Sequence, residues 1–287
     1  MGAVGVLKYL ADDRHTERAV LYLVGVDDGR KFLESTRRTT AVKPVVVLRG
    51  GLTEQGGKAA ASHTGAMAGS AAVFEAAARQ AGAVMCTSTQ EALDLALAFS
   101  YLPLPPGRRV AVVTNGGGVG VLTADEVACH GLALAPLPES LLATLDSLLP
   151  PFYSRRNPLD MVASAGGDVG PAVVEAVARC ESVDALVVLS VLGVANAGDD
   201  ARPMSEDGSY TGLSPWEISY MTEVAELIEE TGKPIVNVYD NPVRQSVFDA
   251  GLRYSPIIVS SPGTAAFVLD RMAWYREYRA KRASVAV

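Results

Sequence analysis

The sequence contains no apolar run that approaches the ~18 residues needed by a membrane-spanning helix, and its N-terminus lacks the apolar core of a signal peptide. We therefore expect a soluble, cytoplasmic protein. Positive charge is also in deficit, because 25 Lys and Arg face 32 Asp and Glu, which gives a formal net charge of −7. This balance argues against a nucleic-acid partner bound through a general basic surface. It leaves room for a local phosphate site.

Cysteine is equally sparse. Cys86, Cys129 and Cys180 lie far apart, and each stands in or beside an apolar run. Neither a CxxC metal motif nor a disulfide framework is indicated, so we interpret all three as small buried hydrophobic residues.

Aromatic residues make up only 6% of the 287 residues, whereas hydrophobic residues make up 49%. This composition favours cores of Ala, Val and Leu, as in α/β proteins with parallel sheets, and the length suffices for two domains. Apolar runs predict strands at Ala19 to Val24, Val45 to Leu48, Ala83 to Cys86, Arg109 to Thr114, Leu132 to Ala135, Ala185 to Val191, Ile235 to Tyr239 and Pro256 to Val259.

Helical patterns separate these runs. They are expected at Val4 to Leu10, Arg30 to Arg38, Ser70 to Ala81, Thr89 to Tyr101, Val121 to His130, Glu139 to Leu148, Pro171 to Cys180, Pro215 to Glu230 and Gly263 to Arg282, with one more helix before Pro256. Strands alternating with helices predict parallel sheets with right-handed crossovers. The Gly- and Asp-rich stretch from Ala195 to Leu213 is expected to be an excursion from this pattern.

A proline-rich segment marks the domain boundary. Leu102 to Gly107 holds three prolines, which neither a helix nor a central strand accommodates. We predict a first domain over residues 1–102, a linker over 103–108 and a second domain over 109–287.

The two halves also share an internal repeat. Apolar strand, helix, Lys-Pro and apolar strand follow one another from Ala19 to Leu48 and again from Ala185 to Tyr239. Further strands and a glycine loop precede the second copy but not the first. The first domain is therefore expected to lack its opening strands, which another chain or upstream sequence would supply, because a bare central strand is prone to pair with other chains.

His63 is one of only three histidines, and it lies among small residues between a predicted strand and an alanine-rich helix. An imidazole can be a metal ligand, a general base or a nucleophile, or it can simply bond the loop backbone. No second His or Cys stands at ligand spacing, so we expect no metal, and no GxSxG elbow indicates a hydrolase. A phosphoryl-accepting histidine and a structural one remain open. His15 and His130 are expected at the surface.

A glycine loop, Asn115 to Gly120, joins a predicted strand to a predicted helix. Backbone N–H groups and the positive end of the helix dipole would meet there without a Cβ to block approach, which suits a phosphate. The spacing fits neither GxxxxGK[ST] nor GxGxxG, which disfavours NAD or ATP. A tight turn needed only for packing is the alternative.

The run from Lys43 to Leu97, with Thr-Glu-x-Gly and Ala-Ala-Ala-Ser-His-Thr-Gly-Ala, resembles the NDP-forming acyl-CoA synthetases. These are the ADP-forming acetate–CoA ligase group related to succinyl-CoA synthetase. Val110 to Gly120 and Asn157 to Asp160 resemble the next domain of that family. The resemblance implies two flavodoxin-like CoA-ligase domains, and a reaction in which acyl-CoA, NDP and phosphate are interconverted with acid, CoA and NTP through a phosphohistidine.

Carried over by position, the resemblance makes His63 the catalytic phosphohistidine. The implied phosphate- and substrate-binding residues are Ser62, Thr64, Gly65, Asn115, Gly116, Gly117, Gly118, Asn157 and Asp160. CoA and ADP/ATP or GDP/GTP with Mg would be substrates held mainly by partner domains, with no tightly bound cofactor.

Departures from the family define the alternatives. A CoA-binding domain, a Ser-x-Ser-Gly phosphate loop and an ATP-grasp domain are missing from this sequence, so we expect partner domains, on other chains or in upstream or downstream sequence, and a hetero- or homo-oligomer. Val24 stands where the family has a glutamate that steadies the histidine, and Glu54 or Asp27 would have to replace it. A catalytically silent, ligase-like scaffolding subunit is the second hypothesis. A CoA-independent acyl- or carbamoyl-transfer enzyme is the third.

Overall fold

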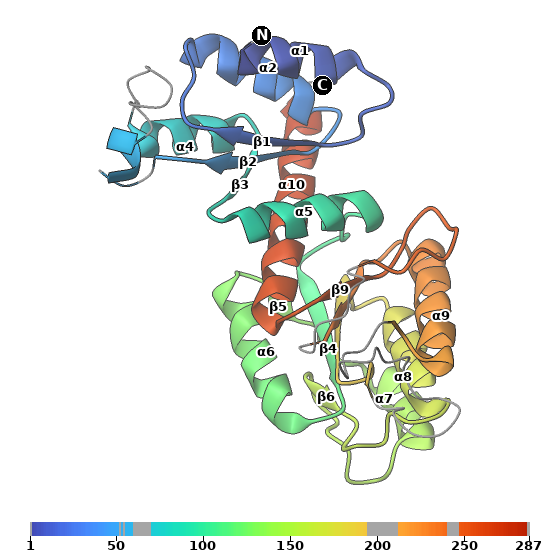
Figure 1. Cartoon of the computed structure of the whole chain (residues 1–287). Coiled ribbons are helices and arrows are strands. Elements are labelled where there is room, and N and C mark those ends of the chain that lie inside the picture. The colour runs from blue at the N-terminus through green and yellow to red at the C-terminus, as the bar shows by residue number, and fades with distance from the viewer. Residues whose placement is uncertain are drawn as a thin grey trace, which may run out of the picture. The chain divides into compact units, whose positions relative to one another are not determined.

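The computed structural model describes residues 2–51, 53, 55–59, 70–193, 212–239 and 247–285 (Figure 1). The chain divides into two compact units: unit 1 holds residues 1–100 and 274–287, and unit 2 holds residues 101–273. One change of unit falls just before the proline-rich segment, and the other falls inside the last helix, α10 (Pro262–Val285). The domain bounds expected from the sequence stay a prediction.

Unit 1 contains a parallel sheet. Its described strands are β1 (Ala19–Leu23), β2 (Val45–Arg49) and β3 (Val84–Cys86), in the order β1-β2-β3. The connecting helices are α1 (Ala3–Asp12), α2 (Gly29–Thr40), α4 (Ala71–Gln80) and α5 (Thr89–Tyr101). Strand, helix and strand succeed one another as the apolar runs predict.

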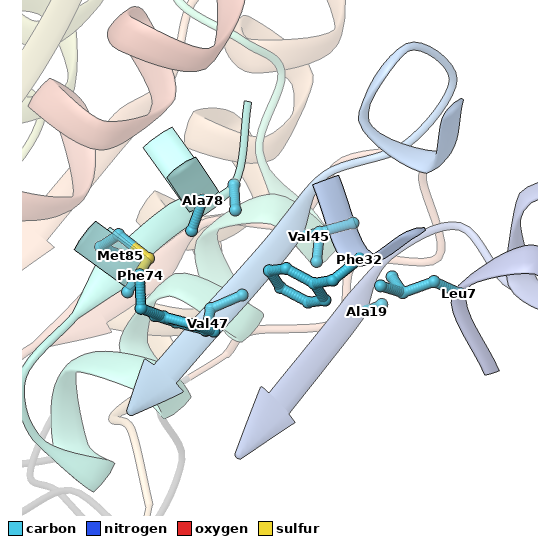
Figure 2. Close-up of a cluster of buried hydrophobic side chains, with 9 residues drawn as sticks. Leu7, Ala19, Phe32, Val45, Val47, Phe74, Ala78 and Met85 are labelled. Atoms are coloured by element: carbon cyan, nitrogen blue, oxygen red, sulfur yellow. The ribbon is translucent and has the colours of Figure 1, made fainter. Parts of the chain in front are cut away.

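Residues of α1, α2, α4 and the three strands together form a hydrophobic core on this sheet (Figure 2). Phe32 of α2 stacks on Phe74 of α4 with ring centroids 5.3 Å apart, and Val45 and Val47 of β2 lie beneath them. At the C-terminal end of α2, Tyr275 of α10 donates its hydroxyl hydrogen to the Thr40 carbonyl at 2.9 Å. Helices therefore pack on the sheet as in other α/β layers.

Unit 2 is built on a larger parallel sheet with the order β5-β4-β7-β8-β9, and β6 also pairs with β4. Its strands are β4 (Arg109–Thr114), β5 (Ala133–Leu134), β6 (Leu159–Asp160), β7 (Ala185–Leu189), β8 (Ile235–Val238) and β9 (Ile257–Val259). The parallel α/β architecture predicted from the sequence is confirmed.

Helices cover both faces of this sheet. They are α6 (Gly117–Cys129), α7 (Glu139–Leu148), α8 (Val169–Ala178), α9 (Pro215–Thr231) and the first half of α10. Figure 1 shows α6 on one side of the sheet and α7, α8 and α9 on the other. Every residue of β7 is buried, as expected for a strand covered on both faces.

In both copies of the internal repeat, the lysine of the Lys-Pro pair donates hydrogen bonds to two backbone carbonyls. Lys43 donates from Nζ to the carbonyls of Asp13 and Thr16, at 2.8 and 2.7 Å, just ahead of β1. In unit 2, Lys233 donates to two carbonyls at the end of α8, at 2.8 and 2.7 Å, shortly before β7. In each Lys-Pro pair, the lysine thus binds backbone carbonyls just before the preceding strand, β1 or β7. The proline keeps the chain extended.

Some sequence expectations need correction. Cys129 is exposed and Cys180 is half-buried, so only Cys86 is a buried cysteine. Helix α6 buries Gly120, Thr123 and Val127, a stripe at helical spacing, and Cys129 lies off that stripe. Helix α6 also begins at Gly117 rather than at Val121.

Two expectations fall wholly or partly outside the described residues. These are the excursion from Ala195 to Leu213 and the helix before Pro256; the described residues 247–256 form no helix. None of the described helices is long and apolar enough to cross a membrane. Nor do the described residues gather a group of His, Cys, Asp and Glu that could hold a metal ion.

Candidate functional site

The histidine loop lies outside the described residues, which include none of Ser62, His63, Thr64 and Gly65. Its flanks are described. Strand β2 ends at Arg49, and α4 begins after Ser70, whose hydroxyl accepts the Val73 N–H at 3.4 Å as an N-cap. The roles predicted for the loop residues stay predictions.

Arg49, the last residue of β2, precedes this loop in the sequence. It is only 4% exposed, its guanidinium carbon lies 4.7 Å from the centroid of the Phe74 ring, and Nη1 donates to the Ser70 carbonyl at 3.2 Å. Burial lowers the pKa of Arg49, and Glu75 partly opposes this shift. Sequence reasoning missed this residue, although a charged residue that ends an apolar strand is a usable signal.

The glycine loop of unit 2 is held in place by its neighbours. Thr114, fully buried at the end of β4, donates from Oγ1 to the Gly116 carbonyl at 3.0 Å and accepts the Gly116 N–H at 3.2 Å. Asn115 accepts the Ala165 N–H on Oδ1 at 3.0 Å, and its own N–H donates to the Leu189 carbonyl at 3.3 Å. The loop is therefore a fixed turn between β4 and α6.

This turn leaves backbone donors available. Gly116 is the N-cap of α6 and has no capping side chain. Within the described part of the chain, the N–H groups of Gly117, Gly118 and Val119 find no acceptor, and all three residues are exposed. Unpaired N–H groups at the positive end of a helix dipole form an anion site.

Asp160 lies beside these donors. A Cβ placed on Gly117 would be 2.9 Å from Asp160 Oδ2, so the carboxylate occupies the space that a larger residue would need. Asp160 Oδ1 accepts the Val162 N–H at 2.9 Å. The structure therefore brings together Asp160 and the glycine loop, which the sequence separates by more than 40 positions.

Asn157 has a different position. Its Oδ1 accepts the Val112 N–H at 2.9 Å, and its Nδ2 donates to the carbonyls of Val110 and Ala135 at 2.8 and 3.0 Å. Strand β4 pairs with β5 at its start and with β6 at its end, and Asn157 bonds the stretch between them. Its side chain braces the sheet, and its predicted contact with phosphate stays a prediction.

Of the two carboxylates that would have to replace the family's glutamate, Asp27 and Glu54, the structure describes only Asp27. Val24, directly after β1, is half-buried. Asp27 is exposed, and Glu54 lies outside the described residues. Asp28, next to Asp27, accepts the Lys31 N–H at 3.0 Å and caps α2. The described contacts thus assign no carboxylate to the glutamate's role.

The position of the glycine loop follows from the sheet topology. The chain passes from β4 to β5 on one side and later returns to β7 on the other side of β4. Ligands of open parallel sheets bind at such a switch point, beyond the carboxyl ends of the strands. The glycine loop lies at this point.

Two protein families match this chain. Residues 1–99 match the succinyl-CoA ligase like flavodoxin domain, and residues 110–201 match the Ligase-CoA domain. The two matched segments flank the proline-rich segment.

Individual proteins agree with this assignment. The alpha subunit of ADP-forming acetate–CoA ligase II from Pyrococcus furiosus is 39% identical over 246 residues, covering 83% of this chain and 53% of the relative. An ADP-forming 4-hydroxybutyrate–CoA ligase from Nitrosopumilus maritimus is 38% identical over 167 residues, covering 58% of this chain and 24% of the relative.

A solved structure is also similar. The dinucleotide forming acetyl-coenzyme A synthetase 1 of Ca. Korarchaeum cryptofilum, in complex with phosphate and ADP, superimposes with a TM-score of 0.79 at 30% identity. The match covers 100% of this chain and 59% of that chain. The matches thus cover between 24% and 59% of the length of these relatives. In domain content, sequence and fold, it belongs to the family of NDP-forming acyl-CoA synthetases related to succinyl-CoA ligase.

Proposed function

We propose that this chain is one component of an NDP-forming acyl-CoA synthetase and that His63 carries the phosphoryl group. The observation that supports this most is the set of unpaired N–H groups at Gly117, Gly118 and Val119, which offer a phosphate site at the start of α6. A phosphate site fits the family of the chain, because the reaction of that family transfers a phosphoryl group.

The reaction would run in three transfers. Phosphate attacks the thioester carbon of acyl-CoA, the C–S bond breaks and CoA leaves as the thiol. A ring nitrogen of His63 attacks the phosphorus of the acyl phosphate, and the carboxylate leaves as the P–O bond breaks. A terminal oxygen of NDP then takes the phosphoryl group as the P–N bond breaks.

The glycine loop would act by electrostatics. Fixed N–H donors stabilise the charge that builds up on phosphoryl oxygens during transfer, and they need no reorganisation because the loop is already held. The Thr114 and Asn115 hydrogen bonds provide this rigidity. Asp160, beside Gly117, would limit how far the phosphate enters.

Partner domains would supply the remaining substrates. Two relatives are named as alpha subunits, and the matches cover only 53% and 35% of them. This supports partners that bind CoA and nucleotide with Mg. These partners would be a CoA-binding domain and an ATP-grasp domain. The relatives are named for acetate and for 4-hydroxybutyrate, so the acid substrate varies within the family.

A reconstituted assembly tests the proposal. The chain is combined with polypeptides that carry the CoA-binding and ATP-grasp domains, and formation of NTP from acyl-CoA, phosphate and NDP is measured. We expect His63→Ala to abolish NTP formation and His15→Ala, at an exposed histidine, to leave it unchanged. Full activity of His63→Ala would refute the proposed role.

The half-buried, apolar Val24 favours a second candidate, a catalytically silent subunit. A carboxylate at this position would orient the histidine and favour its protonated ring, and valine does neither. Stable complexes with partner polypeptides, without phosphohistidine under any combination, would support this candidate instead.

A further inference from the structure

A cavity of about 310 Å³ opens in unit 2 beyond the carboxyl ends of β7, β8 and β9. Its walls also include residues of α6 and the start of α10. It lies at the edge of a parallel sheet where ligands bind in folds of this kind. Of the predicted site residues that the structure describes, Asn115 to Gly118, Asn157 and Asp160, none lines it.

The described lining is mostly apolar. Apolar side chains form most of the wall: Val119, Leu122, Leu189, Leu192, Val238 and Pro262. The polar groups are those of Ser190, Tyr239 and Ser260, and no charged side chain is among the described residues that line the cavity. A charged ligand group would lose hydration against these apolar walls, so the cavity suits an apolar group.

The wall is held in shape by buried contacts. Gly193, with φ at +88°, lies under the Tyr239 ring, where a Cβ would come within 2.8 Å of Cε2. Glu217, fully buried, accepts the Gly193 N–H at 2.7 Å and the Ser214 N–H at 2.9 Å. The cavity is therefore preformed, which lowers the entropy cost of binding.

The cavity adjoins the anion site. Val119 offers one of the unpaired N–H groups at the start of α6, and its side chain lines the cavity. The Asn115 N–H bonds the carbonyl of Leu189, another lining residue, at 3.3 Å. A ligand with an anionic head and an apolar body can therefore bind with its head at the anion site and its body in the cavity.

We propose that this cavity holds the acyl group of the acid substrate and that it selects an apolar, branched or aromatic monocarboxylic acid over acetate and over dicarboxylic acids. This inference rests on the proposed function. A cavity of 310 Å³ equals the share of roughly ten water molecules at ~30 Å³ each. An acetyl group would leave most of this space to water, and a second carboxylate would face described walls that hold no cationic side chain.

Two variants on α6 separate this inference from a general effect. Leu122 lines the cavity and is 60% exposed, whereas its neighbour Val121 is 64% exposed and does not line it. Leu122→Trp fills the cavity from a position that tolerates change, and Val121→Trp is the matched control. Ligand-detected NMR measures the binding of phenylacetate, acetate and succinate to the purified chain.

We expect phenylacetate to bind most tightly and Leu122→Trp to weaken its binding by roughly tenfold or more, with Val121→Trp unchanged. Equal binding of succinate, or equal losses in the two variants, would overturn the inference. Acyl-CoA formation by the reconstituted assembly separates the two claims. If the acids bind as expected but none is activated, the cavity is a binding site for such acids and the proposed function is wrong. Activity that prefers acetate and ignores Leu122→Trp would do the reverse.

Discussion

The Asp160 carboxylate lies against the backbone of Gly117, and a Cβ on Gly117 would be 2.9 Å from Asp160 Oδ2. A Cβ on Gly118, the next residue of α6, would have nothing within 4 Å. These adjacent, exposed glycines are therefore a matched pair that differs in one contact.

We expect Gly118→Ala to raise the free energy of unfolding by about 0.5–1 kcal/mol, because alanine suits a helix and restricts the unfolded chain. Gly117→Ala has to displace the Asp160 carboxylate, which offsets this gain and leaves no change or a net loss. Urea titrations of the two variants give the comparison. Equal gains at both positions would contradict the placement of Asp160.

A variant of Asn157 distinguishes a structural role in the sheet from a role in binding phosphate. Asn157→Ala leaves the Val112 N–H of β4 without its acceptor, whereas the Val110 carbonyl still accepts the Ala135 N–H, so the free energy of unfolding should fall by about 1–3 kcal/mol. Arg156→Ala, at an exposed neighbour, should stay within about 0.5 kcal/mol. If Asn157→Ala kept full stability and lost only phosphate binding, Asn157 would be a ligand contact and no brace.

Lys43 and Lys233, the lysines of the two Lys-Pro pairs, are expected to contribute similar amounts to the free energy of unfolding. Lys43→Met and Lys233→Met each remove two hydrogen bonds to backbone carbonyls, and we expect each to cost about 1–3 kcal/mol of unfolding free energy. Lys31→Met, at a lysine whose side chain is 64% exposed and paired with Asp28, should cost well under 1 kcal/mol. Chemical denaturation of the three variants would measure this. A loss in only one of the two repeats would show that the devices are not equivalent.

Asp184 predicts a specific pH dependence. Hydrogen bonds from Arg109, chiefly from its guanidinium, hold the pKa of Asp184 below 3.8, and the side chain is only 6% exposed. Ionised Asp184 therefore stabilises the fold fully above pH 3.8, and this contribution is lost as the pH falls through the lower, folded pKa.

Asp184→Asn should lower the unfolding free energy at pH 7 by about 1–3 kcal/mol and flatten its decline in acid. Urea titrations between pH 7 and the acid limit, on the wild type and the variant, measure both effects. Parallel pH curves would contradict the account.

Local pattern predicted much of the sheet. Buried parallel strands need apolar residues on both faces, so β2 and β7 stand out as continuous runs, and the glycine loop marks the turn from β4 to α6. The Lys-Pro pairs revealed the repeat because proline restricts the chain locally, whereas the contacts of the two lysines reach carbonyls 27 to 55 positions away and could not be read from the sequence.

Tertiary contacts decided the rest. Asn157 braces β4 because β5 and β6 leave a gap between them, and neither short strand has a strong sequence signal. Arg49 is buried because Phe74 approaches from a helix that follows in sequence. The cavity draws its wall from separate segments of unit 2, and its aliphatic residues look like ordinary core residues in sequence.

His63 is the residue on which the proposed phosphoryl transfer depends most, and mapping its phosphorylation tests that role most directly. The chain and its partner polypeptides are incubated with labelled Mg-ATP or acyl phosphate, and the labelled peptide is sequenced by mass spectrometry. We predict one acid-labile, base-stable label on His63, absent from His63→Ala and retained by His15→Ala. A label that survives His63→Ala unchanged, or no label with any partner combination, would contradict it.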